Sequence, residues 1–135
     1  MKRVKSIAIL LVALITMLAV PASVEAKKKK AEIRFSETSH NFGTIAEKGG
    51  KVSHEFTFYN DGDAPLVIMD ATAECGCTKP EFPANPIEPG KSGKLKVTFN
   101  PLGRPGGFTK TVTVRSNGQP KKTRIKISGV VNPNK

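Results

Sequence analysis

The chain has 135 residues and a formal net charge of +11 at pH 7, with 38% hydrophobic and 6% aromatic residues. That length is enough for one domain with a core of its own. The only cysteines, Cys75 and Cys77, lie too close in sequence to bridge two sheets, which excludes a fold held together by disulfides.

The first 26 residues have the three zones of a secretory signal peptide. In order these are the basic residues Lys2, Arg3 and Lys5, an apolar run from Ile7 to Val20, and the cleavage-site residues Val24-Glu25-Ala26. The apolar run is shorter than the roughly 20 residues that cross a bilayer, and no cysteine follows it to carry a lipid. We therefore expect cleavage after Ala26, in preference to an uncleaved membrane anchor. The expected location is the periplasm or the extracellular space, with no transmembrane segment after processing.

The charge is distributed unevenly along the rest of the chain. Residues 27–31 are expected to form a basic, disordered arm. Residues 31–88 hold ten acids and four bases, whereas residues 89–135 hold eleven bases and no acid. Such asymmetry suggests an electrostatic partner, and export argues against nucleic acid. Anionic glycans or lipid headgroups are the candidate partners, and a surface that is merely solvated is the simpler alternative.

Residues 32–132 show the alternation and frequent turns of β-strands, and no helical periodicity of useful length. Val52, His54, Phe56 and Phe58 alternate with polar residues, which is the period of a half-buried strand. The expected strands are 33–45 with a break, 52–59, a strand opening at Leu66, 94–99, 108–115 and 124–129. Asn117-Gly118 predicts a tight hairpin between the last two. About seven short strands of this kind predict an all-β, immunoglobulin-like sandwich.

Residues 79–90 contain a proline at every third position from Pro80 to Pro89. This spacing suits an extended polyproline II backbone. A proline motif for a partner domain is one interpretation. We prefer a rigid connection along the sandwich edge, because prolines remove sheet donors and protect an edge from pairing.

The strand that opens with Leu66 and Ile68 contains a conflict in its alternation. Continued strictly, their inward parity would bury Asp70 and Glu74, and burying unpaired carboxylates costs more than a backbone irregularity. We therefore predict a bulge near Asp70, which turns every later side chain to the other face. The shift would bring inward Ala71, Ala73, Cys75 and Cys77, with the sulfurs partly covered near the end of the sandwich.

The order of short motifs resembles a known bacterial family. The motifs are HNFGTI at 40–45, FTFYNDG at 56–62, PLVI at 65–68, CGCT at 75–78, PIEPG at 86–90, PGGFTKTVTVRSN at 105–117 and ISGVV at 127–131. Together they closely resemble domain-of-unknown-function family 1573, which is similar to the Hydin-like immunoglobulin sandwiches. The resemblance covers residues 33–131. It implies an exported gram-negative protein with an immunoglobulin-like fold and implies no activity.

Of the motifs in the sequence, only Cys75-Gly76-Cys77 contains side chains that suggest a reaction or a metal site. Residues i and i+2 of a strand lie about 6.7 Å apart, while a disulfide prefers Cα atoms about 5.5 to 6 Å apart, so bonding needs a bend that Gly76 permits. The loop closed is so short that chain entropy gives only about 1.6 kcal/mol. Four interpretations stay open: a structural turn, thiol–disulfide chemistry, a soft-metal site, and exchange with another protein's thiol.

Other polar residues give weaker signals. His54 falls on the inward parity of its strand, where a core role is commoner than metal binding, and the same preference applies to His40. Asp61 and Asp63 have too few ligands for a calcium loop, so a turn is expected. Paired as a hairpin, the last two strands would place Arg115, Arg124 and Lys126 on one outer face, a candidate site for polyanions.

The sequence therefore predicts a non-catalytic, immunoglobulin-like binding or assembly module of the cell envelope. No spacing of Ser, His and Asp suggests an enzyme, and we expect no cofactor. A protein or another envelope component is the expected partner. The alternative is a redox or soft-metal-handling protein that acts through Cys75 and Cys77, with the metal left unspecified.

Overall fold

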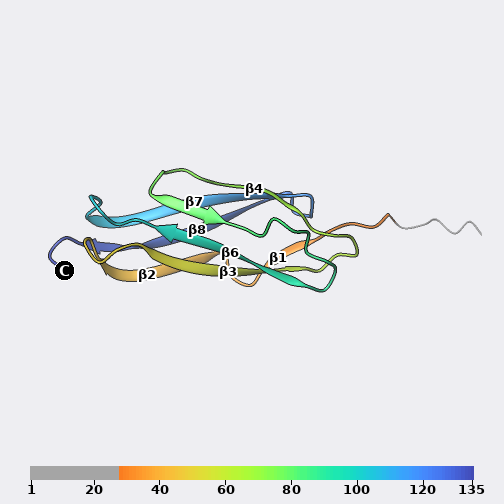
Figure 1. The fold of residues 1–135 in the computed structure, drawn as a ribbon, viewed down its shortest axis with the longest axis horizontal. Helices are drawn as coiled ribbons and strands as arrows, with labels where there is room; N and C mark the ends of the chain where they lie inside the picture. Colours follow the sequence, from red (N-terminus) through yellow and green to blue (C-terminus); the bar gives the residue numbers. More distant parts are fainter. Residues whose placement is uncertain (1–27) are drawn as a thin grey trace, which may run out of the picture.

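The computed structural model describes residues 28–135, which form two four-stranded β-sheets packed face to face (Figure 1). The first sheet has the order β1-β3-β6-β5, with β1 (Ile33–Phe35), β3 (Val52–Asn60), β6 (Ser92–Phe99) and β5 (Thr78–Glu81). The second has the order β2-β8-β7-β4, with β2 (Ser39–Ala46), β8 (Lys122–Asn132), β7 (Gly106–Ser116) and β4 (Ile68–Ala73). This arrangement confirms the predicted immunoglobulin-like sandwich. The expected signal peptide and its cleavage site lie outside the described residues.

The core comes from alternate residues of the four central strands, as the period of two predicts. Phe56 and Phe58 of β3 and Phe99 of β6 are fully buried. They face an apolar layer from the other sheet, made by Val112, Val114, Ile125, Ile127 and Val131. Each buried phenylalanine contributes about 1.5 to 3 kcal/mol relative to exposure, so packing holds the two sheets together.

Residues 33–45 form two strands in different sheets, where the sequence predicted one strand with a break. β1 pairs with β3, and β2 pairs in parallel with β8. Ser36 N–H donates to the Thr57 carbonyl, and two residues later the Thr38 carbonyl accepts from Lys126 N–H. The chain thus crosses from one sheet to the other within a few residues because both edges offer backbone partners there.

The bulge near Asp70 is confirmed. The pairing of β4 with β7 shifts between Ile68 and Asp70, so Met69 is left over and points outward. After the shift, Ala71 and Ala73 pack against the core while Glu74 is exposed. Asp70 itself is half-buried, and its Oδ1 has no hydrogen-bond partner in residues 28–135.

The two-residue hairpin expected at Asn117-Gly118 is wrong in its length. β7 and β8 do pair as antiparallel neighbours, but residues 117–121 form the connection, with a cis peptide bond before Pro120. Asn117 is used elsewhere: its Oδ1 accepts from Val67 N–H at 2.8 Å, and its own N–H donates to the Val67 carbonyl. The loop therefore anchors the start of the neighbouring strand.

Part of the proline segment is a strand, although all of it was expected to be a loop. Thr78–Glu81 is the edge strand β5, where Pro80 lies opposite Val97. An edge strand has one side without partners, so a proline is tolerated there. Further on, Ile87 and Leu66 exchange two backbone hydrogen bonds of 2.8 and 2.9 Å, which fixes the segment along the sandwich.

Two residues of the expected arm, Lys30 and Ala31, contact the rest of the domain. Ala31 is buried and accepts a hydrogen bond from Gln119 N–H, and Lys30 N–H donates to the Asp63 carboxylate at 2.6 Å. In residues 28–135, no helix is long and apolar enough to cross a membrane.

Candidate functional site

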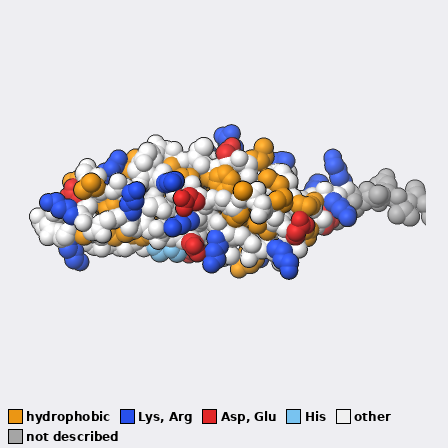
Figure 2. Space-filling model, in the orientation of Figure 1, with side chains coloured by type: hydrophobic (Ala, Val, Ile, Leu, Met, Phe, Trp, Pro, Cys, Tyr) orange, Lys and Arg blue, Asp and Glu red, His pale blue; other side chains and the backbone are white. Residues whose placement is uncertain are grey.

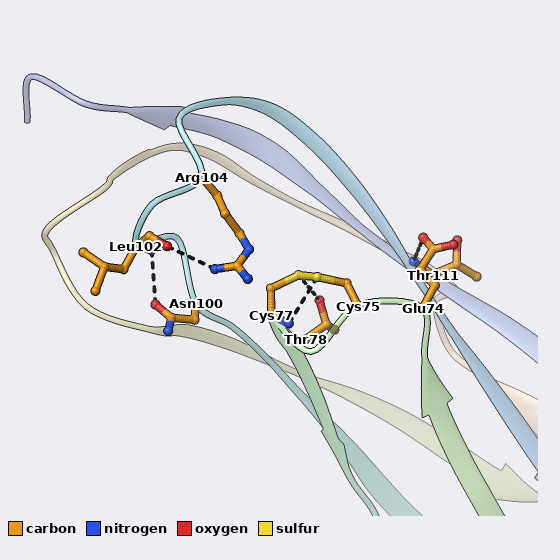
Figure 3. Close-up of a disulfide and its surroundings, with 8 residues drawn as sticks. All are labelled: Glu74, Cys75, Cys77, Thr78, Asn100, Leu102, Arg104 and Thr111. Carbon is orange, nitrogen blue, oxygen red and sulfur yellow. Dashed lines mark hydrogen bonds between the residues drawn. A yellow bond between two sulfur atoms is a disulfide. The ribbon is translucent and has the colours of Figure 1, made fainter.

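The Cys-Gly-Cys motif forms the corner between β4 and β5, where the chain passes from one sheet to the other (Figure 3). Three hydrogen bonds fix the corner. Glu74 Oε1 accepts from Thr111 N–H at 2.8 Å, Cys75 O from Thr78 N–H at 3.1 Å, and Cys77 O from Asn100 N–H at 2.9 Å. Neighbours from β5, β6 and β7 therefore hold both cysteines at the end of the sandwich.

Cys75 and Cys77 are joined by a disulfide, with Cα atoms 5.2 Å apart. This separation is shorter than that of i and i+2 residues in an extended strand, so the chain bends at Gly76 as the sequence suggested. In this state neither sulfur is a thiolate, and a soft metal would need the pair to be reduced first. The structure thus brings the two candidate site residues together in one disulfide.

The two sulfurs differ in their surroundings. Cys77 is 4% exposed and lies beside the Thr78 hydroxyl, whereas Cys75 is half-buried and its Sγ accepts the Cys77 N–H at 3.1 Å. Gly76 is exposed, and a Cβ added there would have no atom within 4 Å. The disulfide is therefore covered on the core side and open on the side of Gly76.

Basic side chains border this open side. A pocket of about 290 Å³ is lined by Gly76, Cys77 and three lysines, Lys51, Lys79 and Lys96, with Glu81 as its single acid. Lys79 lies 3.5 Å from Glu81. Within residues 28–135, Lys51 and Lys96 have no carboxylate at ion-pair distance. No local sequence pattern predicts this pocket, because its lysines come from three separate segments.

An arginine approaches the same corner from the β6–β7 loop. Arg104 donates from Nη1 to the Leu102 carbonyl at 3.0 Å. Figure 3 shows its guanidinium directed toward the side of the disulfide. Three lysines and this arginine therefore border the corner that carries the disulfide, with Glu81 as the acid of the pocket.

The two histidines meet between the sheets, which the sequence did not predict. His40 of β2 and His54 of β3 stack with ring centroids 3.6 Å apart, and each ring meets a phenylalanine edge-on. His54 Nε2 hydrogen-bonds Glu37. Partial burial and the neighbouring His54 lower the pKa of His40, while Glu37 acts in the opposite direction. No cluster of three or more metal-ligating side chains occurs in the described part of the chain.

The candidate polyanion residues Arg115, Arg124 and Lys126 are exposed on the outer face of β7 and β8. Acidic residues share this face: Asp70 pairs with Arg115 in the β4–β7 register, and Glu74 hydrogen-bonds Thr111, the partner of Lys126. In Figure 2, basic side chains are spread along the whole length of the molecule. The three residues do lie on one face, and their binding role stays a prediction.

The aspartates at 61–63 form a turn, as expected. Arg34 Nε donates to the Asp61 carboxylate at 2.6 Å. The Asp63 carboxylate accepts a hydrogen bond from Lys30 N–H, and Asp63 N–H donates to the Lys30 carbonyl. Both carboxylates are thus occupied by the structure around them.

One edge of the sandwich exposes apolar side chains. β4 and β5 are the edge strands on this side of the two sheets, and they contact each other. Met69, left outside by the bulge, is 65% exposed, and Phe82, next to the end of β5, is 36% exposed. Sequence reasoning predicted the bulge but missed Met69, whose exposure follows directly from it.

Solved structures with this fold share little sequence with the chain. A protein of unknown function from Porphyromonas gingivalis W83 is 17% identical, with a TM-score of 0.66 over 82% of this chain and 51% of its own. The ASH/PapD-like domain 7 of human CEP192 is 15% identical, with a TM-score of 0.59 over 86% and 96% of the two chains. The Escherichia coli chaperone DraB is 12% identical, with a TM-score of 0.52 over 76% and 56%.

These likenesses support the immunoglobulin-like, PapD-like sandwich and extend no further than the fold. The chain spans about half the length of the P. gingivalis protein. No curated protein matches the sequence. Residues 33–131 match the family described as protein of unknown function (DUF1573), and the chain belongs to that family.

Proposed function

We propose that the chain is an exported, non-catalytic module that binds a protein partner in the cell envelope. The observation that carries this proposal is the apolar edge at β4 and β5, where Met69 and Phe82 are exposed. Isolated apolar residues are common on surfaces. Here they flank the edge strands β4 and β5. The outer backbone groups of β4 have no partner in either sheet and offer hydrogen bonds to an added strand, whereas β5 contains Pro80, which has no N–H to donate.

The fold comparison supports a binding role. DraB is a chaperone, and the human domain has the same PapD-like architecture. A partner strand laid along β4 would contact Met69 directly. Phe82 would lie on the same side of the sandwich as this partner strand. The backbone would supply affinity, and the two side chains would supply specificity.

Replacing the exposed apolar side chains of this edge by charged ones tests whether it binds a partner. Met69→Lys with Phe82→Lys should shift the native protein from a larger complex to the monomer in size-exclusion of gently solubilised envelopes. The matched control is Leu102→Lys with Val130→Lys, which places the same change on exposed apolar residues elsewhere. If both double variants migrate like the wild type, the edge is not the binding surface.

Export is proposed from the signal-peptide pattern of residues 1–26. Fractionation should recover the protein in the periplasm or the medium. Its intact mass should match a chain whose first residue is Lys27. A species in the envelope that still carries Met1 would instead assign a membrane anchor.

A second candidate function is thiol–disulfide chemistry at Cys75 and Cys77. It is favoured by the half-buried position of Cys75 and by the open side at Gly76. Protein isolated without reductant should resist alkylation at both cysteines and accept two alkyl groups after mild reduction. Full alkylation without any reductant would show free thiols in the native compartment and remove this candidate.

A further inference from the structure

We propose that the lysine pocket beside the disulfide selects the thiol that reacts with it: a peptide thiol with neighbouring carboxylates. This inference rests on the second candidate function, and it names the substrate class of that site. It starts from the fact that Gly76 and Cys77 line the same pocket as Lys51, Lys79 and Lys96.

The charge of the pocket favours an anion. Lys79 lies close to Glu81, and Lys96 lies between Glu55 and Glu81 in the strand register, whereas Lys51 has no carboxylate at ion-pair distance in residues 28–135. With three lysines against one glutamate, the lining of the pocket is positive on balance. Lys96 lies on β6, and Lys51 directly precedes β3, so two rigid strands of one sheet position these two ammonium groups. A volume of about 290 Å³ suits a side-chain-sized group such as a carboxylate. Exposed charges of this kind accelerate encounter with an oppositely charged reactant, in a manner weakened by salt.

The disulfide is placed to be attacked from the open side. Cys75 is half-buried, whereas Cys77 is 4% exposed and is held beside the Thr78 hydroxyl. Cys77 lines the pocket and Cys75 does not, so a thiol that attacks Cys75 approaches from beside the pocket while its carboxylates reach the lysines. An incoming thiolate forms a bond to Cys75 Sγ, the Sγ–Sγ bond breaks, and its electron pair goes to Cys77 Sγ. The leaving thiolate accepts a hydrogen bond from Thr78 and a proton from water.

A second thiolate of the same class then attacks the mixed disulfide at the sulfur of the first thiol. Cys75 leaves as a thiolate, and the two peptide thiols end as one disulfide. Two electrons and two protons have moved from the peptide thiols to the cysteine pair of this chain. The disulfide itself is the oxidant, so one turnover needs no further reagent.

The pair is suited to this exchange because its bond closes a three-residue loop. A loop that short removes little chain entropy from the unfolded chain, so the bond adds little stability and we expect its reduction to leave the sandwich intact. The core is made by packing and contains the fully buried Phe56, Phe58 and Phe99.

The test compares two thiol probes on the full chain. Glutathione carries two carboxylates, and 2-mercaptoethanol carries none. Rate constants for reduction of the disulfide are measured by acid quenching and mass spectrometry at low salt, and each is corrected for the thiolate fraction of the probe. The ratio of the glutathione rate to the mercaptoethanol rate measures how strongly the pocket favours a thiol that carries carboxylates.

Lys51→Gln with Lys96→Gln should lower this ratio about three-fold to ten-fold, with a smaller decrease in the mercaptoethanol rate, because the mercaptoethanol thiolate carries one negative charge and no carboxylate. The matched control, Lys122→Gln with Lys126→Gln, removes the same charge from the outer face of the other sheet and should keep the wild-type ratio. Added salt at 0.5 M should reduce the wild-type ratio toward that of the pocket variant.

The two possible failures are distinguishable. If mercaptoethanol reduces the pair no faster than it reduces a linear peptide disulfide and no mixed disulfide at Cys75 is trapped, thiol–disulfide chemistry at this site is wrong. If mercaptoethanol reacts readily but the ratio is equal in the wild type, the pocket variant and the control, the redox site stands and the pocket proposal is overturned.

Discussion

His40 and His54 stack face to face with ring centroids 3.6 Å apart, although they belong to different sheets. The pair joins β2 to β3 along one side of the sandwich. Protonation of His40 would place a positive charge against the ring of His54. The stack is therefore a point where acid acts on the packing between the sheets.

Acidification should destabilise the fold through His40. Partial burial and His54 lower its pKa below the ordinary value of 6.5, against the opposing effect of Glu37. The unfolded chain then takes up this proton first as the pH falls. The stability that His40 contributes is thus fully present above about pH 6.5 and is lost as the pH falls through the folded pKa.

Urea unfolding at pH 7.5 and pH 5.0 measures this loss. His40→Gln should show a smaller loss than the wild type, while Asn41→Gln, an exposed neighbour on the same strand, should match the wild type. An unchanged loss in His40→Gln would assign the acid sensitivity to other groups.

Reduction of the disulfide should cost little stability. The loop between Cys75 and Cys77 is so short that the chain-entropy contribution is about 1.6 kcal/mol before any strain is subtracted. Denaturant unfolding of the oxidised and the reduced wild type measures the difference without a mutation. A loss of several kcal/mol, or unfolding on reduction, would make the disulfide a structural staple.

Gly62→Ala should destabilise the fold strongly, whereas Gly76→Ala should be tolerated. A Cβ at Gly62 would lie 2.2 Å from the Lys30 carbonyl oxygen and 2.6 Å from the Glu32 nitrogen, and backbone atoms there are fixed by hydrogen bonds. At Gly76 the same Cβ meets open space. We expect a loss of about 1 to 3 kcal/mol or more for Gly62→Ala, measured by thermal melting. Equal melting temperatures for the two variants would contradict the close packing of the N-terminal segment.

The outer face of β7 and β8 should behave as a solvated surface. Neutralising Arg115, Arg124 and Lys126 should reduce retention on heparin at low salt no more than neutralising Lys48, Lys91 and Lys94 does. The reason is that Asp70 and Glu74 accompany the first set on its face. A clearly larger effect of the first set would assign a polyanion site to this face.

The sequence was sufficient for the elements whose burial follows from local alternation. Phe56 and Phe58 show the inward parity of β3, and the cost of burying Asp70 and Glu74 predicted the bulge after which Ala71 and Ala73 pack against the core. Both inferences depend only on the cost of burying particular side chains within one strand.

Features that depend on contact between separate segments could not be predicted in this way. The stack of His40 on His54 needs the relative position of the two sheets, and the lysine pocket needs three segments to converge. The local sequence predicted a hairpin role for Asn117. Its hydrogen bonds to Val67, which lies 50 residues earlier and directly precedes β4, cannot be inferred from the neighbouring residues.

Photo-crosslinking in living cells tests directly whether the edge at β4 and β5 binds a protein in the envelope. A photoreactive residue is placed at Met69, and a control is placed at Thr57 on the outer face of the first sheet. We expect a discrete, higher-mass adduct from position 69 in the envelope fraction, and none from position 57. No adduct from position 69, or the same adducts from both positions, would contradict it.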